Sequence, residues 1–70
     1  MDSIEIYQVQ VSLIPIAPPN KQFFQFKYFT DIQEAQNYAN TVTSPDALVN
    51  SVHIIQHYFG QDGYSASIFD

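Results

Sequence analysis

The sequence has no cysteine and no arginine, and its only formal cations are Lys21 and Lys27. Without cysteine the chain forms neither disulfides nor thiolate metal sites, which are the usual staples of small secreted domains. No apolar run approaches the roughly 18 residues of a membrane span, and no charged-then-apolar leader stands at the start. We therefore expect a soluble, cytoplasmic protein.

The shortage of basic residues also limits the class of partner. Nucleic-acid binding at physiological salt typically uses about six or more Lys or Arg contacts to phosphates, whereas this chain has seven acids and a formal net charge of −5. We expect no direct binding to nucleic acid and none to an anionic membrane surface. The acids are scattered along the chain, so solubility explains them more simply than imitation of a phosphate backbone, which stays open.

The length of 70 residues allows one small domain over residues 1–70. A chain this short buries only about 60% of its unfolded surface, and ordering it costs roughly 1.5 kcal/mol per residue. The core must therefore be dense, or a partner must complete it. Aromatic residues, at 16% of the chain, are the material available for either purpose.

Two strands and a proline-bearing hairpin tip are predicted in the N-terminal part. Residues 4–13 alternate between apolar and polar side chains from Tyr7 onward, which is the period of a half-buried strand. Ile4 and Ile6 fall in the opposite phase, which indicates either a bulge near Tyr7 or a second, partly covered face. Three prolines in residues 14–20 end this strand. Residues 23–30 read as its antiparallel partner.

A helix is predicted from about Ile32 to Val42. Asp31 is a suitable N-cap, and Glu34 stands three residues later, where it can complete a capping box. The apolar residues that follow recur at helical spacing and form one narrow stripe, consisting of Ala35, Tyr38, Ala39 and Val42.

Residues 44–60 carry conflicting signals. Ser44, Pro45 and Asp46 are typical of a helix start, whereas the β-branched residues that follow favour a strand. We predict a short helical turn over Pro45–Val49 and a strand over Ser51–Phe59. The alternative is a second helix at about 45–59. Residues 60–63, Gly-Gln-Asp-Gly, predict a hairpin turn that leads into a last strand over residues 64–69.

These elements predict an α+β fold with the order ββαββ, in which one helix packs on one face of a four-stranded, mostly antiparallel sheet. The predicted core consists of Val9, Val11, Leu13, Phe24, Phe26, Tyr28, Ala35, Tyr38, Ala39, Val42, Val52, Ile54, Ala66 and Ile68.

Large apolar side chains are left over for the other face of the sheet. They are Ile4, Ile6, Phe23, Phe29, Ile55, Phe59 and Phe69. Either the segments 14–19 and 44–50 fold back over them, or the face is an interface to another protein or to a second copy. We favour the interface, because a monomer seldom exposes so large an apolar patch and because aromatic residues are enriched at interaction hot spots.

The two histidines are the main candidates for chemistry. His53 and His57 are four residues apart and share a face on a strand or a helix. With Tyr58 they could form a pH-sensitive or ligand-binding site, and association would then change between about pH 5.5 and 7. A metal site is disfavoured because no third ligand lies nearby in the sequence. We expect no cofactor.

No catalytic motif is present: the chain has no Gly-x-Ser-x-Gly elbow and no phosphate-binding glycine loop. The leading hypothesis is a small, acidic, non-enzymatic protein-binding module, a regulator or inhibitor of the kind that phages and mobile elements encode, and a homodimer. One alternative is a small-ligand binder or minor enzyme with a pocket at a subunit interface near His53 and His57. Another is a structural subunit of a larger assembly. The sequence leaves the partner and the host open.

Overall fold

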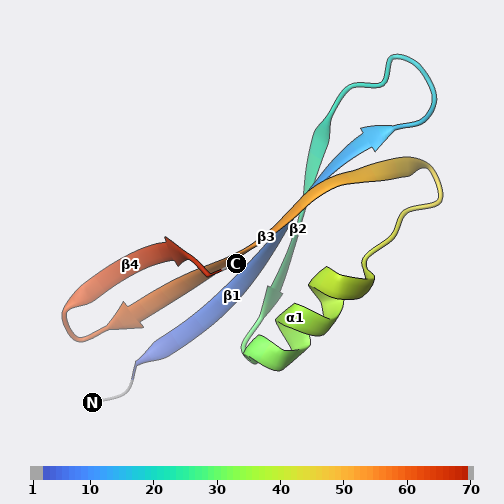
Figure 1. The fold of residues 1–70 in the computed structure, drawn as a ribbon. Coiled ribbons are helices and arrows are strands. Elements are labelled where there is room, and N and C mark those ends of the chain that lie inside the picture. Colours follow the sequence, from blue (N-terminus) through green and yellow to red (C-terminus); the bar gives the residue numbers. More distant parts are fainter. Residues whose placement is uncertain (1–2, 70) are drawn as a thin grey trace.

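The computed structural model describes residues 3–69. Its elements follow in the order β1 (Ile4–Pro15), β2 (Phe23–Phe29), α1 (Ile32–Thr41), β3 (Ala47–Gly60) and β4 (Gly63–Ile68) (Figure 1). All neighbouring strands are antiparallel, and the sheet order is β2-β1-β3-β4. The α+β fold with ββαββ order is confirmed.

The sheet is long and narrow because its two central strands extend beyond the outer ones. β1 and β3 have 12 and 14 residues and pair with each other from Ile4 to Pro15 of β1. β2 pairs only with residues 7–13 of β1, whereas β4 pairs with residues 55–60 of β3. The outer strands therefore flank opposite ends of the central pair, as Figure 1 shows, and the Cα extents are 50 × 21 × 14 Å.

The irregularity in the β1–β3 pairing lies further along than predicted, and its extra residue is Asn50 of β3. Pairing with β3 is regular through Ser12, and the register shifts between Ser12 and Leu13. Ser12 is buried there, and its Oγ accepts hydrogen bonds from the side chains of Gln22 and Asn50, the latter at 3.4 Å. A bulge near Tyr7 is therefore wrong. Ile4 and Ile6 are out of phase because they occupy the second face of a regular strand.

The β1–β2 hairpin has the predicted proline-bearing tip, and Asn20 holds it. Its φ of 58° lies in the left-handed region, which asparagine tolerates better than most residues. Its side-chain amide donates to the carbonyl oxygens of Pro15 and Ile16, at 2.8 and 2.9 Å. The backbone N–H of Ile16 also donates to the carbonyl of Asp46, at 3.0 Å, which ties the tip to the α1–β3 connection.

The helix begins as predicted and ends at Thr41, one residue before the predicted end. Asp31 has extended backbone angles, and its carboxylate accepts from the backbone N–H of Gln33 at 3.0 Å. Glu34 makes no reciprocal bond to Asp31, so only half of the capping box forms between these two described residues. The helix buries Ala35 fully and packs the rest of its apolar stripe against the core.

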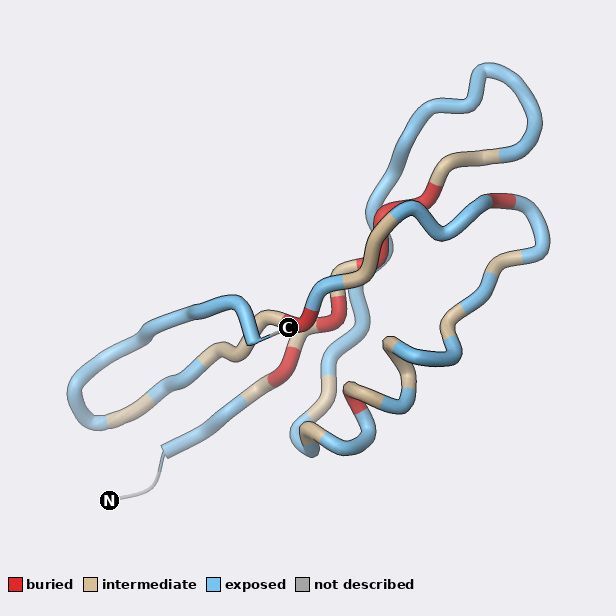
Figure 2. The backbone as a smooth tube through the Cα atoms, in the orientation of Figure 1, coloured by how far each residue is buried: buried red, intermediate tan, exposed pale blue. Residues whose placement is uncertain are grey.

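The core lies where α1 covers the central strands, as Figure 2 shows. It consists of Tyr7, Val9, Val11, Leu13, Ala35, Ala47 and Ile54, with Phe29, Ile32, Tyr38, Ala39, Val42 and Val52 packed around it. The helix has 10 residues and is therefore about 15 Å long, so it covers only the middle of one face.

The predicted helical turn at Pro45–Val49 is wrong, and so is the alternative of a helix at 45–59. A bend occupies Pro45 and Asp46, and β3 begins at Ala47. The physical reason is β1, which continues to Pro15 and offers a partner to Ala47 and Leu48. Ladder pairing and β-branched side chains together outweigh the local helix-start signal.

Five residues of the predicted core lie on the other face. Phe24, Phe26 and Tyr28 are 58%, 47% and 61% exposed, Ala66 is exposed, and Ile68 is 74% exposed. In β2 both faces carry aromatic rings, so alternation alone does not say which set points inward. The register of β2 against β1 decides which side chains face the core, because Phe26 pairs with Gln10 and not with Val9 or Val11. In β4 the two apolar residues pair with His57 and Ile55.

Candidate binding surface on the open face of the sheet

The side of the sheet away from α1 is called the open face here. Directly paired residues of antiparallel strands project to the same face, and Val9, Val11 and Leu13 mark the helix side because they are buried in the core. The register then assigns the open face to Ile4, Ile6, Gln8, Gln10, Ser12 and Ile14 of β1, Phe24, Phe26 and Tyr28 of β2, Leu48, Ser51, His53, Ile55, His57 and Phe59 of β3, and Tyr64, Ala66 and Ile68 of β4.

Aromatic rings gather at the two ends of this face. Phe24 and Phe26 stack with centroids 6.4 Å apart at one end. At the other end Tyr64 stands between two rings, 4.9 Å from Phe59 and 5.8 Å from His57. The two groups come from β2 and from the β3–β4 hairpin, so they occupy opposite ends and opposite edges of the sheet.

A chain of side-chain hydrogen bonds crosses the open face between these groups. Nε2 of Gln8 donates to the hydroxyl of Tyr28 at 3.3 Å. Oε1 of Gln8 lies 2.8 Å from Nε2 of His57, and Nδ1 of His57 lies 2.7 Å from the hydroxyl of Tyr64. Because Oε1 only accepts, Nε2 of the imidazole carries a proton, and in the neutral ring Nδ1 accepts from Tyr64. The four residues belong to the four strands, so their polar groups satisfy one another across the whole sheet.

A shallow hollow lies beside this chain on the open face. It is lined by Ile6, Gln8, Tyr28, His57 and Phe59 and has a volume of about 170 Å³. Typical small-molecule pockets have volumes of about 300–1,000 Å³. A hollow of this size fits one inserted side chain. A second hollow of about 280 Å³ adjoins it and is lined by Ile6, Tyr28, Phe29, Thr30 and Glu34.

The open face carries no Asp, Glu or Lys among the described residues. Glu5 and Lys27 lie on the helix side, where Glu5 bonds Tyr7 and Nζ of Lys27 stands 5.8 Å from the ring centroid of Tyr38. The other described charges are on the helix, in the loops or in the β3–β4 turn. A chain of net charge −5 therefore presents one uncharged, aromatic face.

The predicted interface set is divided between the two faces. Ile4, Ile6, Ile55 and Phe59 lie on the open face, as predicted. Phe23, Phe29 and Phe69 do not, and this part of the assignment is wrong. Phe23 and Phe29 pair with Leu13 and Tyr7 of the core face. Phe29 also packs 5.6 Å from the ring of Tyr38, and Phe69 makes an edge contact with Tyr7 at 6.0 Å.

The alternative, in which the segments 14–19 and 44–50 fold back over the apolar residues of the open face, is also wrong. Ile4 and Phe59 remain 57% and 43% exposed with both connecting loops in place. The sequence reasoning missed Phe24, Phe26, Tyr28, Tyr64 and Ile68 as open-face residues. The pairing of β2 with the polar residues of β1 could have found the three residues of β2, and the pairing of β4 with Phe59 and Ile55 of β3 could have found the other two.

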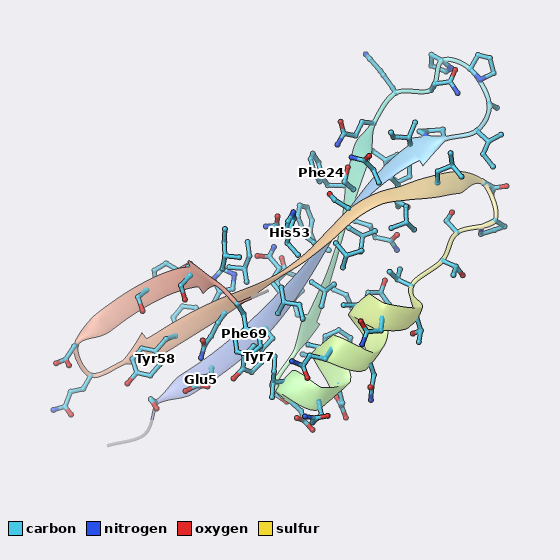
Figure 3. All side chains as sticks on the ribbon, viewed as in Figure 1. Glu5, Tyr7, Phe24, His53, Tyr58 and Phe69 are labelled. Atoms are coloured by element: carbon cyan, nitrogen blue, oxygen red, sulfur yellow. The ribbon has the colours of Figure 1, made fainter. Side chains whose placement is uncertain are left out.

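The two histidines lie together on the open face, and Tyr58 does not join them. His53 pairs with Gln10 and His57 with Ile6, whereas Tyr58 pairs with Glu5 and faces the helix side. Figure 3 shows His53 and Phe24 on the side of the strands away from α1. Within residues 3–69 no group of three or more His, Asp or Glu side chains is placed to hold a metal ion. The pH dependence of association stays a prediction.

The helix side has one polar site of its own, around Tyr7. The hydroxyl of Tyr7 donates to Oε1 of Glu5 at 2.9 Å, and Nε2 of Gln56 donates to the same oxygen at 3.2 Å. The hydrogen bond to Glu5 raises the pKa of Tyr7 above its ordinary value, and burial of the ring and the charges of Glu5 and Asp31 act in the same direction. These hydrogen bonds link the N-terminal end of β1 to β3.

Comparison with protein-family models, with curated proteins and with solved structures gives no match to this chain. In the part of the chain that the structure describes, no helix has both the length and the apolar character needed to cross a membrane.

Proposed function

We propose that this protein is a small, non-enzymatic protein-binding module, and that the open face is its binding surface. The observation that carries the proposal is the combination of exposed aromatic rings with the lack of formal charge on that face. The hydrogen-bonded polar groups support it, because Gln8 and His57 can be covered by a partner without losing their hydrogen bonds.

The energetics favour a covered face. Full burial of one large apolar side chain contributes about 1.5–3 kcal/mol, and the open face exposes at least Phe24, Phe26 and Ile68 by nearly half of their surface or more. Monomers seldom keep apolar patches of more than a few hundred Å² in water. Tyr and Phe rings around a shallow hollow also match the composition of interaction hot spots.

The mode of action that fits this surface is occlusion, in which the module covers a flat apolar patch of another protein in the cytoplasm and so regulates or inhibits it. Such an action needs no catalytic group and no cofactor. The remaining alternative, a structural subunit of a larger assembly, would use the same face but would keep it covered permanently.

The test is affinity capture from the native host with two matched variants. Phe26→Asp places a carboxylate on the open face, whereas Gln25→Asp places the same carboxylate on the adjacent, exposed residue of β2, which faces the helix side. We expect mass spectrometry to identify a partner with wild type and Gln25→Asp that is lost with Phe26→Asp. A partner retained equally by both variants would refute the open face as the binding surface.

A further inference from the structure

We infer that a second copy of this chain can occupy the open face, giving a face-to-face homodimer of two sheets with the two helices outside. The inference rests on the proposed function of that face and specifies one occupant for it. A twofold dimer uses the same patch on both subunits, so the patch must be large enough, uncharged or self-complementary, and free of polar groups that burial would leave unpaired.

The area of the face approaches the first requirement. The β1–β3 pair is 12 residues long and the shorter strands β2 and β4 pair over 7 and 6 residues, so at about 3.4 Å per residue and about 4.8 Å between strands the flat footprint is roughly 600 Å². Projecting side chains add to this footprint, and a standard interface buries about 800 Å² of accessible surface on each partner. The helix occupies only the other side, so the whole length of the open face is available. Two sheets packed face to face are separated by about 10 Å, a space that aromatic side chains from both faces can fill.

The charge distribution meets the second requirement. Each chain carries a formal net charge of −5, which opposes association through any surface that brings the carboxylates together. The open face is the exception, because none of its described residues is Asp, Glu or Lys. Pairing through this face leaves Glu5 and Asp31 on the helix sides of the two sheets, while Glu34 stands at the edge of the contact, beside Ile6 and Tyr28.

The hydrogen-bond chain meets the third requirement for the four side chains that form it, whereas Gln10 and His53 make no side-chain hydrogen bond within the described residues and would have to pair across the interface. The side chains of Tyr28, Gln8, His57 and Tyr64 already bond to one another within one copy. Covering them costs less than covering unpartnered groups, because a buried polar group that keeps its hydrogen bond avoids most of the desolvation penalty. The rings of Phe24 and Phe26 have no polar groups, so their burial is favourable and breaks no hydrogen bond.

The experiment uses the unaltered chain. A mixture of isotope-labelled and unlabelled protein is examined for intermolecular nuclear Overhauser effects, with sedimentation equilibrium on the same sample. We expect a dimer mass, with intermolecular contacts at Phe24, Phe26, Tyr64 and Ile68. We expect none at Tyr38, which belongs to α1, or at Phe29, which packs against it. Contacts confined to the helix side or to the backbone of an edge strand would overturn the inference.

A monomer mass at millimolar concentration without intermolecular contacts would also overturn it. That result leaves the proposed function standing if Phe26→Asp still abolishes capture of a host partner and Gln25→Asp does not. If both experiments fail, the open face is not a binding surface at all. The two failures are therefore distinguishable.

Discussion

At the scale of single residues, Tyr7 links the core to a polar network. Its ring is buried and touches Phe69, while its hydroxyl bonds Glu5. The raised pKa of Tyr7 means that the folded state favours the protonated phenol. The associated stability is therefore fully present below the pKa of an unfolded tyrosine, about 10, and is lost as the pH rises through the higher pKa of the folded state.

We predict that the free energy of unfolding falls as the pH is raised above about 10, and that it falls less steeply in Tyr7→Phe, which has no hydroxyl to ionise. Urea denaturation between pH 7 and 11 measures this. Tyr58→Phe is the control, because the hydroxyl of Tyr58 bonds to no described side chain. Equal slopes in wild type and Tyr7→Phe would contradict the role of the Tyr7–Glu5 bond.

The two glycines that flank the β3–β4 turn should differ in how much stability is lost when each is replaced by alanine. Gly63 has a φ of 115°, which residues with a side chain rarely adopt, whereas a Cβ at Gly60 would meet only the movable tip of the Tyr58 side chain. We predict that Gly63→Ala lowers the free energy of unfolding by about 1–3 kcal/mol and that Gly60→Ala lowers it less. Thermal denaturation of both variants measures these losses of stability. A larger loss in Gly60→Ala than in Gly63→Ala would contradict the prediction.

At the scale of elements, the helix depends on its N-cap. The carboxylate of Asp31 accepts from the N–H of Gln33, whereas Glu34 makes no return bond to Asp31. We predict that Asp31→Ala costs about 1 kcal/mol of stability and that Glu34→Ala costs only a few tenths, the value of a charge in the first turn. Chemical denaturation followed by circular dichroism measures both, and similar losses would mean that Glu34 also caps the helix.

Elements with one dominant signal could be predicted from the sequence. The helix was predictable because its cap, its apolar stripe and its length agree, and β1 because its core-facing residues alternate with Gln8, Gln10 and Ser12. The start of β3 could not be predicted from the sequence. Ser44, Pro45 and Asp46 favour a helix locally, and only the pairing with the end of β1 outweighs this preference. Tertiary contacts of this kind have no local trace in the sequence.

The faces of β2 were unpredictable for a different reason. Phe24, Phe26 and Tyr28 form the more apolar phase of β2, and the other phase mixes Phe23 and Phe29 with Gln25 and Lys27, so alternation favours the wrong set as the core-facing one. The sequence therefore predicted a surplus of aromatic residues and an uncovered face correctly, but it assigned parts of β2 and β4 to the wrong sides. The pairing with Gln8 and Gln10 was needed to correct the candidate surface.

At the scale of the whole molecule, a single short helix leaves one side of the sheet without a layer. Small domains stabilise a sheet by burying one face against another element, and α1 does this only for the middle of the helix side (Figure 1). The described residues of the open face include exposed aromatic rings and no Asp, Glu or Lys. The central claim is that a second copy of this chain covers this face.

Sedimentation equilibrium of Phe26→Asp beside Gln25→Asp tests this claim most directly, because the two variants add the same charge to adjacent exposed positions on opposite faces of β2. We predict that both stay folded and that only Phe26→Asp loses the mass of the dimer. Because Phe26 is 47% exposed, its substitution should not unfold the monomer. A dimer that persists in Phe26→Asp, or that is lost equally in Gln25→Asp, would contradict the account.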